Sequence, residues 1–206
     1  GFGWSNRKVI LTFGLLSPGK GIETMIAAMP AVVRQVPDAL YTVLGATHPH
    51  CFARDGECYR ETLIKQADEL GVGDHVCWID GFCETDELLD YLAAADIYAT
   101  PYLNPAQVTS GTLAYAIGLG KPVVSTPYVH ARELLGGGFG RLVDFGDSAG
   151  FAAAIVDLLE DEVGLMDLRK RTYALGRTMV WPRLAEAAMA RFEEQLPHPD
   201  PKPQPI

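Results

Sequence analysis

The sequence predicts an α/β protein in which helices cover both faces of a parallel sheet. Short apolar segments rich in β-branched residues alternate with helical segments along most of the 206 residues. This alternation is typical of parallel sheets that are buried on both faces. The length suits one such domain with a full core and is short for two. Ligands of these sheets bind beyond the carboxyl ends of the strands, so a functional site is expected in the loops found there.

Six apolar runs account for the expected strands. Each is short and bounded by glycine, proline or polar residues, which is the pattern of a buried strand. They cover residues 8–14, 40–45, 75–79, 96–100, 122–125 and 140–143. A long loop, residues 101–110, is expected after the fourth of them.

The segments between the strands carry apolar residues at helical spacing. Helices are expected from about residue 20, over 59–70, after 85, from about 111, near 132–135, after 148, and over 165–175 and 182–196. Pro30 lies inside the first helix and should kink or break it. Thr85 and Ser148 are candidate N-caps, and Gly71 is a helix stop. Residues 46–57 are expected to form a polar loop.

Composition and charge limit the partners. The formal net charge of −9 argues against a nucleic-acid partner, which needs clustered Lys and Arg. No apolar run reaches the roughly 18 residues of a membrane span, and membrane contact is left open. The N-terminus lacks the pattern of a signal peptide and resembles the cut end of a longer chain. With no Cys-x-x-Cys pair among four cysteines, free thiols and a cytoplasmic location are expected.

Two further local patterns are interpreted from spacing and composition. The cluster His48, His50, Cys51 and Cys58 matches no common zinc spacing, so no metal site is predicted. The proline-rich residues 197–206 are expected to form a disordered tail.

A glycine-rich turn after the first strand is the first candidate site. It reads Gly14-Leu15-Leu16-Ser17-Pro18-Gly19-Lys20-Gly21 and joins a strand to a helix, so free backbone N–H groups are expected to point outward. Glycine allows a ligand to approach closely, and Lys20 can place a positive charge near a phosphate. The turn by itself is equally compatible with a tight connection and a solvated lysine.

A polar helix start after the fourth strand is the second candidate site. It reads Gln107-Val108-Thr109-Ser110-Gly111-Thr112-Leu113-Ala114-Tyr115, in which Thr109 or Ser110 is a natural N-cap. The N–H groups of Gly111 and Thr112 and the helix dipole favour an anion, although such residues also cap helices that bind nothing. Two sites of this kind at one sheet edge suit a nucleoside diphosphate, provided that they converge.

Five segments in a fixed order carry a family resemblance. They are VILTFGLLSPGKGIETMIAAMP, LGVGDHVCWIDGF, LLDYLAAADIYATPYL, GTLAYAIGLGKPVVSTPYVHARELL and GRLVDFGDSAGFAAAIVDLLED. The series resembles the C-terminal half of family 4 retaining glycosyltransferases. The resemblance implies a Rossmann-like sheet that forms one half of a GT-B fold over residues 1–196, with an N-terminal acceptor domain missing. Trp181 and the final helix resemble the helix that packs back across the interdomain cleft.

The resemblance also implies roles for individual residues. Lys20 would contact the donor phosphates and Gln107 the transferred sugar, and these two are the candidate catalytic residues. The residues implied to bind the nucleotide sugar are Gly14, Thr109, Ser110, Gly111, Thr112 and Tyr115. The nucleotide sugar is the implied partner, and neither a cofactor nor a metal is implied. His130 could approach a sugar phosphate or could be an ordinary loop residue.

The chain departs from the family pattern at three positions. Leu15 replaces the usual arginine of the turn, and Gln107 and Tyr115 replace two glutamates. A glutamine can hydrogen-bond to sugar hydroxyls but cannot act as a base. The resemblance implies transfer of a sugar to a hydroxyl acceptor with retention, by a domain that is inactive in isolation. The alternative is a non-catalytic nucleotide-sugar-binding or assembly module. A dinucleotide-binding domain is not predicted, because no G-x-G-x-x-G opens the first helix.

Overall fold

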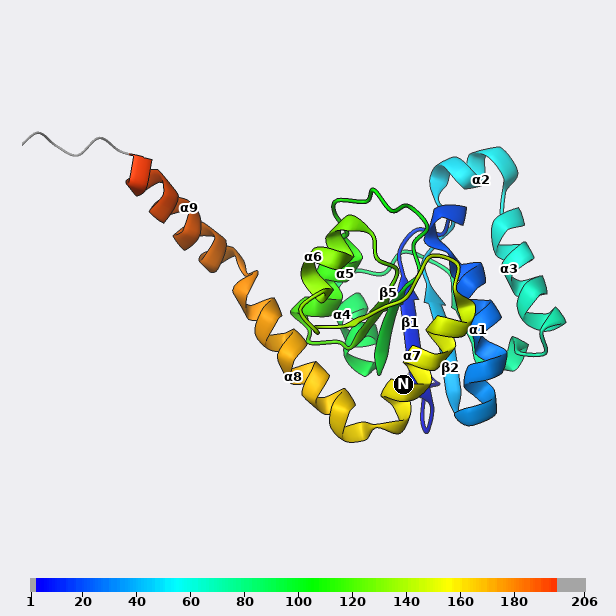
Figure 1. Cartoon of the computed structure of the whole chain (residues 1–206). Coiled ribbons are helices and arrows are strands. Elements are labelled where there is room, and N and C mark those ends of the chain that lie inside the picture. Colours follow the sequence, from blue (N-terminus) through cyan, green and yellow to red (C-terminus); the bar gives the residue numbers. More distant parts are fainter. Residues whose placement is uncertain (1–2, 196–206) are drawn as a thin grey trace, which may run out of the picture.

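A parallel sheet runs through the middle of the computed structural model, which describes residues 3–195 (Figure 1). In sheet order its six strands are β3 (Val76–Ile79), β2 (Ala39–Leu44), β1 (Lys8–Phe13), β4 (Ile97–Thr100), β5 (Val123–Ser125) and β6 (Arg141–Leu142). Every neighbouring pair is parallel. The direction of winding reverses between β1 and β4, the switch point at which such sheets bind ligands. The predicted fold class is confirmed.

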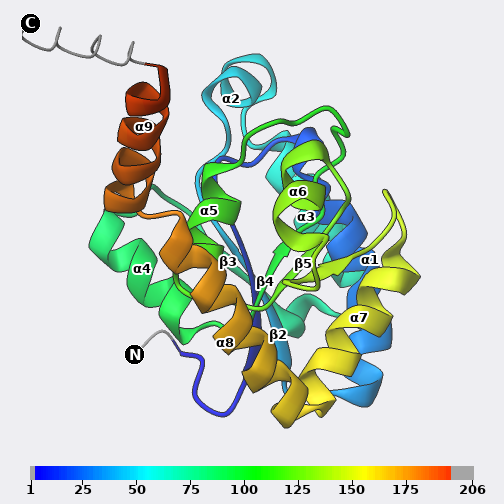
Figure 2. The ribbon, with the colours of Figure 1, turned by 60° about the vertical axis from the view of Figure 1, so that its left-hand side comes forward.

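Helices cover both faces of this sheet, as Figure 2 shows for α4 and α5 on one side and α1 and α7 on the other. One hydrophobic cluster joins the sheet to α1 (Ile22–Gln35), α3 (Cys58–Glu69) and α7 (Ser148–Glu160). A second cluster joins it to α4 (Thr85–Ala94), α5 (Gly111–Gly118) and α6 (Val129–Leu135). Side chains along β1 alternate between the clusters, with Ile10 in the first and Leu11 in the second. This alternation follows from the two-residue period of a strand.

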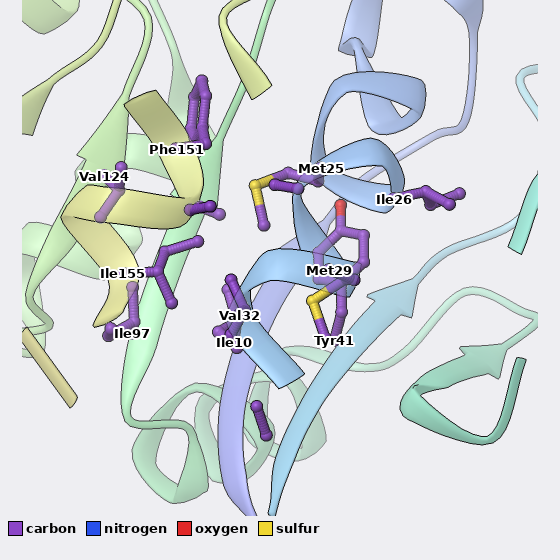
Figure 3. Packing of buried hydrophobic residues seen from close by; sticks show 14 of the residues in the cluster. Ile10, Met25, Ile26, Met29, Val32, Tyr41, Ile97, Val124, Phe151 and Ile155 are labelled. Carbon is purple, nitrogen blue, oxygen red and sulfur yellow. The ribbon is translucent and has the colours of Figure 1, made fainter. Parts of the chain in front are cut away.

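The first cluster is the larger part of the core. Figure 3 shows Met25 and Met29 of α1 beside Phe151 and Ile155 of α7, above the strand residue Ile10. All five side chains are fully buried. Both helices therefore rest firmly on β1 and its neighbours, which fixes where the loops after those strands emerge.

Three local expectations are wrong. The break considered at Pro30 does not occur, since α1 continues through the proline and buries residues on both sides of it, including Met29 and Val32. The expected loop 46–57 contains the helix α2 (Pro49–Asp55), whose residues are exposed or partly buried and so show no apolar period. The N-caps of α4 and α7 are Glu84 and Asp147, each one residue before the predicted Thr85 and Ser148. The stop at Gly71 is confirmed by its φ of 69°.

Lys121 fastens the C-terminal end of α4 to the start of β5. Its Nζ donates to the carbonyls of Ala93 and Ala95, both at 2.7 Å. Burial, together with the neighbouring positive charge of Arg169, lowers the pKa of this lysine to about 8. An ammonium at a helix C-terminus complements the partial negative charge of the last carbonyls.

Two helices follow α7, and the second of them extends away from the sheet (Figure 1). α8 (Glu162–Thr178) packs on α5 through Gly176, where an added Cβ would lie 2.5 Å from the carbonyl oxygen of Ile117. α9 (Trp181–Gln195) is exposed along its length, including 81% of Trp181 and 68% of Phe192. None of the helices within residues 3–195 is both long and apolar enough to cross a membrane. The expected tail 197–206 and Leu196 lie outside the described residues.

Candidate functional site

The turn after β1 is held by hydrogen bonds to the chain beyond β2. The N–H groups of Gly14 and Leu16 donate to the carbonyls of Leu44 and Ala46, each at 2.9 Å. The expectation of free outward N–H groups is therefore wrong for these two residues, because the strand pairing continues into the turn. A short 3-10 helix, η1 (Pro18–Lys20), then carries the chain to Lys20, and Gly21 with a φ of 64° begins α1.

Lys20 crosses the switch point to reach the loop after β4. Its Nζ donates to the hydroxyl of Tyr102 at 2.9 Å and lies 4.1 Å from the centre of the tyrosine ring. The same hydroxyl is 2.8 Å from Oγ1 of Thr112, which is 3.1 Å from Oγ of Ser110. The two candidate sites are therefore joined by one continuous chain of polar contacts. Tyr102, which the sequence analysis missed, is the link between them.

The N-terminus of α5 faces this network. Ser110, rather than Thr109, is the N-cap, and its hydroxyl accepts from the N–H of Leu113 at 3.3 Å. Gly111 and Thr112 are the first two helical residues, so their N–H groups have no acceptor inside the helix. These donors and the ammonium of Lys20 make the region suitable for an anion.

Two glycines shape the turn, for different reasons. At Gly14 the φ of 122° favours glycine, since an added Cβ would make only ordinary contacts, 3.4 Å from Cγ2 of Thr112 and 3.6 Å from Nζ of Lys20. An added Cβ at Gly21 would lie 2.1 Å from the carbonyl oxygen of Pro101. The backbone of the first turn thus lies directly against the loop after β4.

A cavity of about 280 Å³ adjoins the network at the ends of β1, β2 and β3. Among residues 3–195 no charged side chain lines it, and its walls are mostly apolar. Tyr115 lies at its mouth, 43% exposed, with its ring edge-on to Phe13 at 6.4 Å between centres. The lining residues are Phe13, Gly14, Leu15, Leu44, Gly45, Ala46, Gly81, Phe82, Cys83, Thr85, Leu88 and Tyr115.

Arg60 connects the loops after β2 and after β3, both of which contribute lining residues to this cavity. Its guanidinium donates to the carbonyl of Gly45 at 2.8 Å and to the carboxylate of Asp80 at 2.7 Å. Arg60 also forms an ion pair with Glu57 at 3.1 Å. The pKa of Glu57 is lowered, mainly by a hydrogen bond from the Thr47 hydroxyl and also by Arg60. Arg60 is only 7% exposed. A buried arginine on a helix gave no periodic signal that could have marked it in the sequence.

Gln107 belongs to the loop that leads into α5. Its Nε2 donates to the carbonyl of Thr109 at 2.9 Å, and its own backbone carbonyl accepts from the N–H of His130 at 3.2 Å. The Nδ1 atom of His130 in turn accepts from the N–H of Ser110 at 2.9 Å. The structure therefore brings Gly14, Lys20, Ser110 and Thr112 directly together, while Gln107 is placed on the adjoining loop.

Comparison with known proteins relates this arrangement to one sequence family. Residues 3–179 match the family described as "Glycosyl transferases group 1". A GDP-mannose-dependent alpha-(1-6)-phosphatidylinositol monomannoside mannosyltransferase of Mycolicibacterium smegmatis is 32% identical over 204 residues, which cover 93% of this chain and 50% of that protein. A D-inositol 3-phosphate glycosyltransferase of Corynebacterium efficiens is 28% identical over 92% of this chain and 43% of its own. The chain thus spans about half the length of such relatives.

Solved structures share the fold. Anabaena Alr3699/HepE, crystallised in complex with UDP, superposes with a TM-score of 0.79 at 23% identity, covering 94% of this chain and 50% of that one. The C-terminal domain of a glycosyl transferase group 1 family protein from Francisella tularensis superposes with a TM-score of 0.71 at 17% identity, covering 84% and 85%.

Proposed function

The chain belongs to the glycosyl transferases group 1 family, and on that premise we propose that residues 1–196 are the donor-binding half of a GT-B enzyme. The donor is a nucleoside diphosphate sugar, and the acceptor is a hydroxyl group held by an N-terminal half. The observation that carries the proposal is the contact between Lys20, Tyr102 and Thr112 across the β1–β4 switch point. A cytoplasmic location is part of the proposal, supported by the free cysteines.

The geometry supports a division of the donor between the two regions of the site. The diphosphate would lie against Lys20 and the N–H groups of Gly111 and Thr112, where positive potential is concentrated. The nucleoside would enter the adjoining uncharged cavity, with Tyr115 at its mouth beside the ribose. A cavity of this character, mostly apolar with a few polar groups at one end, is typical of small-molecule sites.

The proposed reaction depends on stabilising the leaving group. Departure of the nucleoside diphosphate concentrates negative charge on its phosphate oxygens. The Lys20 ammonium and the helix N-terminus are fixed in advance and can stabilise that charge without reorganising. Gln107 would hydrogen-bond to the transferred sugar, since an amide offers both donors and an acceptor but no base. Retention of configuration is the stereochemical course that we propose from the family.

The exposed helix α9 supports a missing acceptor half. Trp181, Leu184, Met189 and Phe192 lie on it with more than half of their surfaces exposed. Exposed apolar surfaces of this kind mark interaction sites. We propose that the acceptor half covers this helix and completes the active site, so that the 206-residue chain binds donor but turns nothing over.

A second candidate function is favoured by the residues at three site positions. Leu15, Gln107 and Tyr115 supply neither the cation nor the carboxylates of the usual family pattern. A non-catalytic nucleotide-sugar-binding or assembly module would need none of them. If Lys20→Ala abolishes sugar transfer by the full-length protein, the result supports an enzyme. If the substitution leaves the cellular function of that protein unchanged, the result supports a non-catalytic module.

A thermal-shift screen with GDP-mannose, UDP-glucose and ADP-glucose tests donor binding. GDP-mannose heads the screen because the relative from M. smegmatis is GDP-mannose-dependent. A ligand that binds the native state stabilises it and so raises the melting temperature. At a ligand concentration of a hundred times Kd, the free energy of unfolding increases by about 2.7 kcal/mol. We expect a shift with one nucleotide that Lys20→Ala abolishes and the exposed-site control Lys65→Ala retains. No shift with any of the three would contradict the proposal.

A further inference from the structure

His130 holds the loop before α5 by two separate hydrogen bonds. Its backbone N–H donates to the carbonyl of Gln107 at 3.2 Å, and its ring atom Nδ1 accepts from the N–H of Ser110 at 2.9 Å. The preceding residue, Val129, donates to the carbonyl of Pro105 at 3.2 Å. Backbone contacts therefore hold residues 105 and 107, while the Ser110 end of the loop is held by the imidazole ring.

The direction of the ring contact determines the state of the imidazole. A backbone N–H can only donate, so Nδ1 must be the unprotonated nitrogen, and a neutral ring carries its proton on Nε2. The ring thus acts as a hydrogen-bond acceptor toward Ser110. Acceptance by Nδ1 is a function that an asparagine Oδ1 can also perform, since both atoms are bonded directly to Cγ.

Ser110 is the residue on which the helix start depends. It is 5% exposed, its hydroxyl caps Leu113, and it contacts Thr112, which reaches Lys20 through Tyr102. The N–H of an N-cap residue takes no part in the helix and needs an acceptor when it is buried. Removing the imidazole would leave this N–H without its acceptor and release the N-cap from its orientation.

We propose that His130 is a positioning residue of the donor site. Its ring orients Ser110, and through Ser110 it fixes the N–H groups of Gly111 and Thr112, so that they and the ammonium of Lys20 can donate to the same diphosphate. His130 acts through Ser110 and does not touch the donor. The effect on affinity rests on the proposed function, whereas the effect on Ser110 does not.

Three variants of His130 test the role. His130→Ala removes the hydrogen-bond acceptor, His130→Asn restores it at the same position, and His130→Gln moves it one bond further out. Arg132→Ala is an exposed control on the same helix. Calorimetry at pH 8 gives the Kd for GDP-mannose, with UDP-glucose in parallel. NMR gives the hydrogen-exchange rate of the Ser110 amide. We expect His130→Ala to weaken binding about tenfold and to speed exchange at Ser110 by a similar factor, as loss of one hydrogen bond predicts. His130→Asn should remain within about twofold of the native protein in both, and His130→Gln should resemble the alanine variant.

The two readouts separate the possible failures. Native affinity and native exchange in His130→Ala would overturn the proposal. In His130→Asn, the Ser110 amide could exchange at the native rate while donor affinity stays as low as in His130→Ala. That result would show that the ring contacts the donor itself, which also overturns a positioning role. If the native protein binds neither nucleotide sugar, the proposed donors are wrong, and the exchange rates still decide whether the ring holds Ser110.

Discussion

Replacing Lys20 by methionine tests the phosphate contact most directly. Methionine keeps an unbranched side chain of similar length and removes the charge. In the free protein the ammonium is held by the Tyr102 hydroxyl at 2.9 Å and by the ring at 4.1 Å, so it is already oriented before any ligand arrives. A charge-assisted hydrogen bond contributes about 1.5–3 kcal/mol. We therefore expect donor affinity to fall by about 10- to 150-fold.

The effect on folding should be modest. Loss of the charge-assisted bond to Tyr102 costs about 1.5–3 kcal/mol, which lowers the melting temperature of a chain of this size by about 3–12 °C. Lys20→Met is thus expected to remain folded at the temperature of the binding assay, so its loss of affinity would reflect the site rather than unfolding.

Isothermal titration calorimetry with the nucleotide sugar identified by the thermal-shift screen measures the effect. Lys65→Met is the matched control, because Lys65 has 76% of its side chain exposed and forms a surface ion pair with Glu69 at 3.6 Å. Tyr102→Phe keeps the ring under the ammonium and removes the hydroxyl, so it should weaken binding less than Lys20→Met. Equal affinity of the native protein and Lys20→Met would refute the reasoning, since the ammonium would then serve Tyr102 alone.

Two other substitutions probe the surroundings of the site. Gly21→Ala places a Cβ 2.1 Å from the carbonyl oxygen of Pro101 at a φ of 64°, so we expect the free energy of unfolding in urea to fall by about 2 kcal/mol or more. Gly19→Ala is the control, because its Cβ would meet nothing within 4 Å. Equal losses in the two variants would contradict the steric argument. For Lys121 the folded pKa of about 8 lies below the ordinary 10.5, so the unfolded chain binds more protons between these values, and native stability relative to Lys121→Met should rise from pH 8 toward pH 10. A difference that stays flat with pH would contradict that assignment. Above pH 10 the buried tyrosines Tyr41 and Tyr98, whose pKa values burial raises, should make the stability of both proteins fall.

The elements that the sequence predicts well are those whose packing leaves a periodic trace. The strands β1, β2, β4 and β5 are buried along almost all of their length, and α1 buries one regular face, so apolar runs and apolar spacing mark them in the sequence. The helix α2 was missed because its residues are exposed or partly buried, so no stripe distinguishes it from a polar loop. Pro30 was misjudged for the opposite reason, because tertiary packing of the α1 face outweighs one missing hydrogen bond.

The site was predictable in outline and not in its connections. The strand-end rule places Lys20 and the start of α5 at one edge of the sheet, and the helix start itself follows from capping preferences. The partner of Lys20 could not be read in this way, because Tyr102 lies 82 positions further along the chain in an irregular loop. Arg60 and the contact of His130 with Ser110 were equally hidden, since a side chain that reaches a neighbouring loop leaves no pattern in its own segment.

The seam between β1 and β4 has a consequence for how the protein acquires its activity. The two strands pair through Ile10 with Ile97 and Leu11 with Tyr98, although β2, β3, four α-helices and two 3-10 helices lie between them in the chain. Contacts so distant in sequence carry a large loop-closure cost and form late. A refolding chain can therefore form either side of the sheet and still lack a nucleotide site. The rate at which ligand binding recovers would report the rate at which β1 pairs with β4.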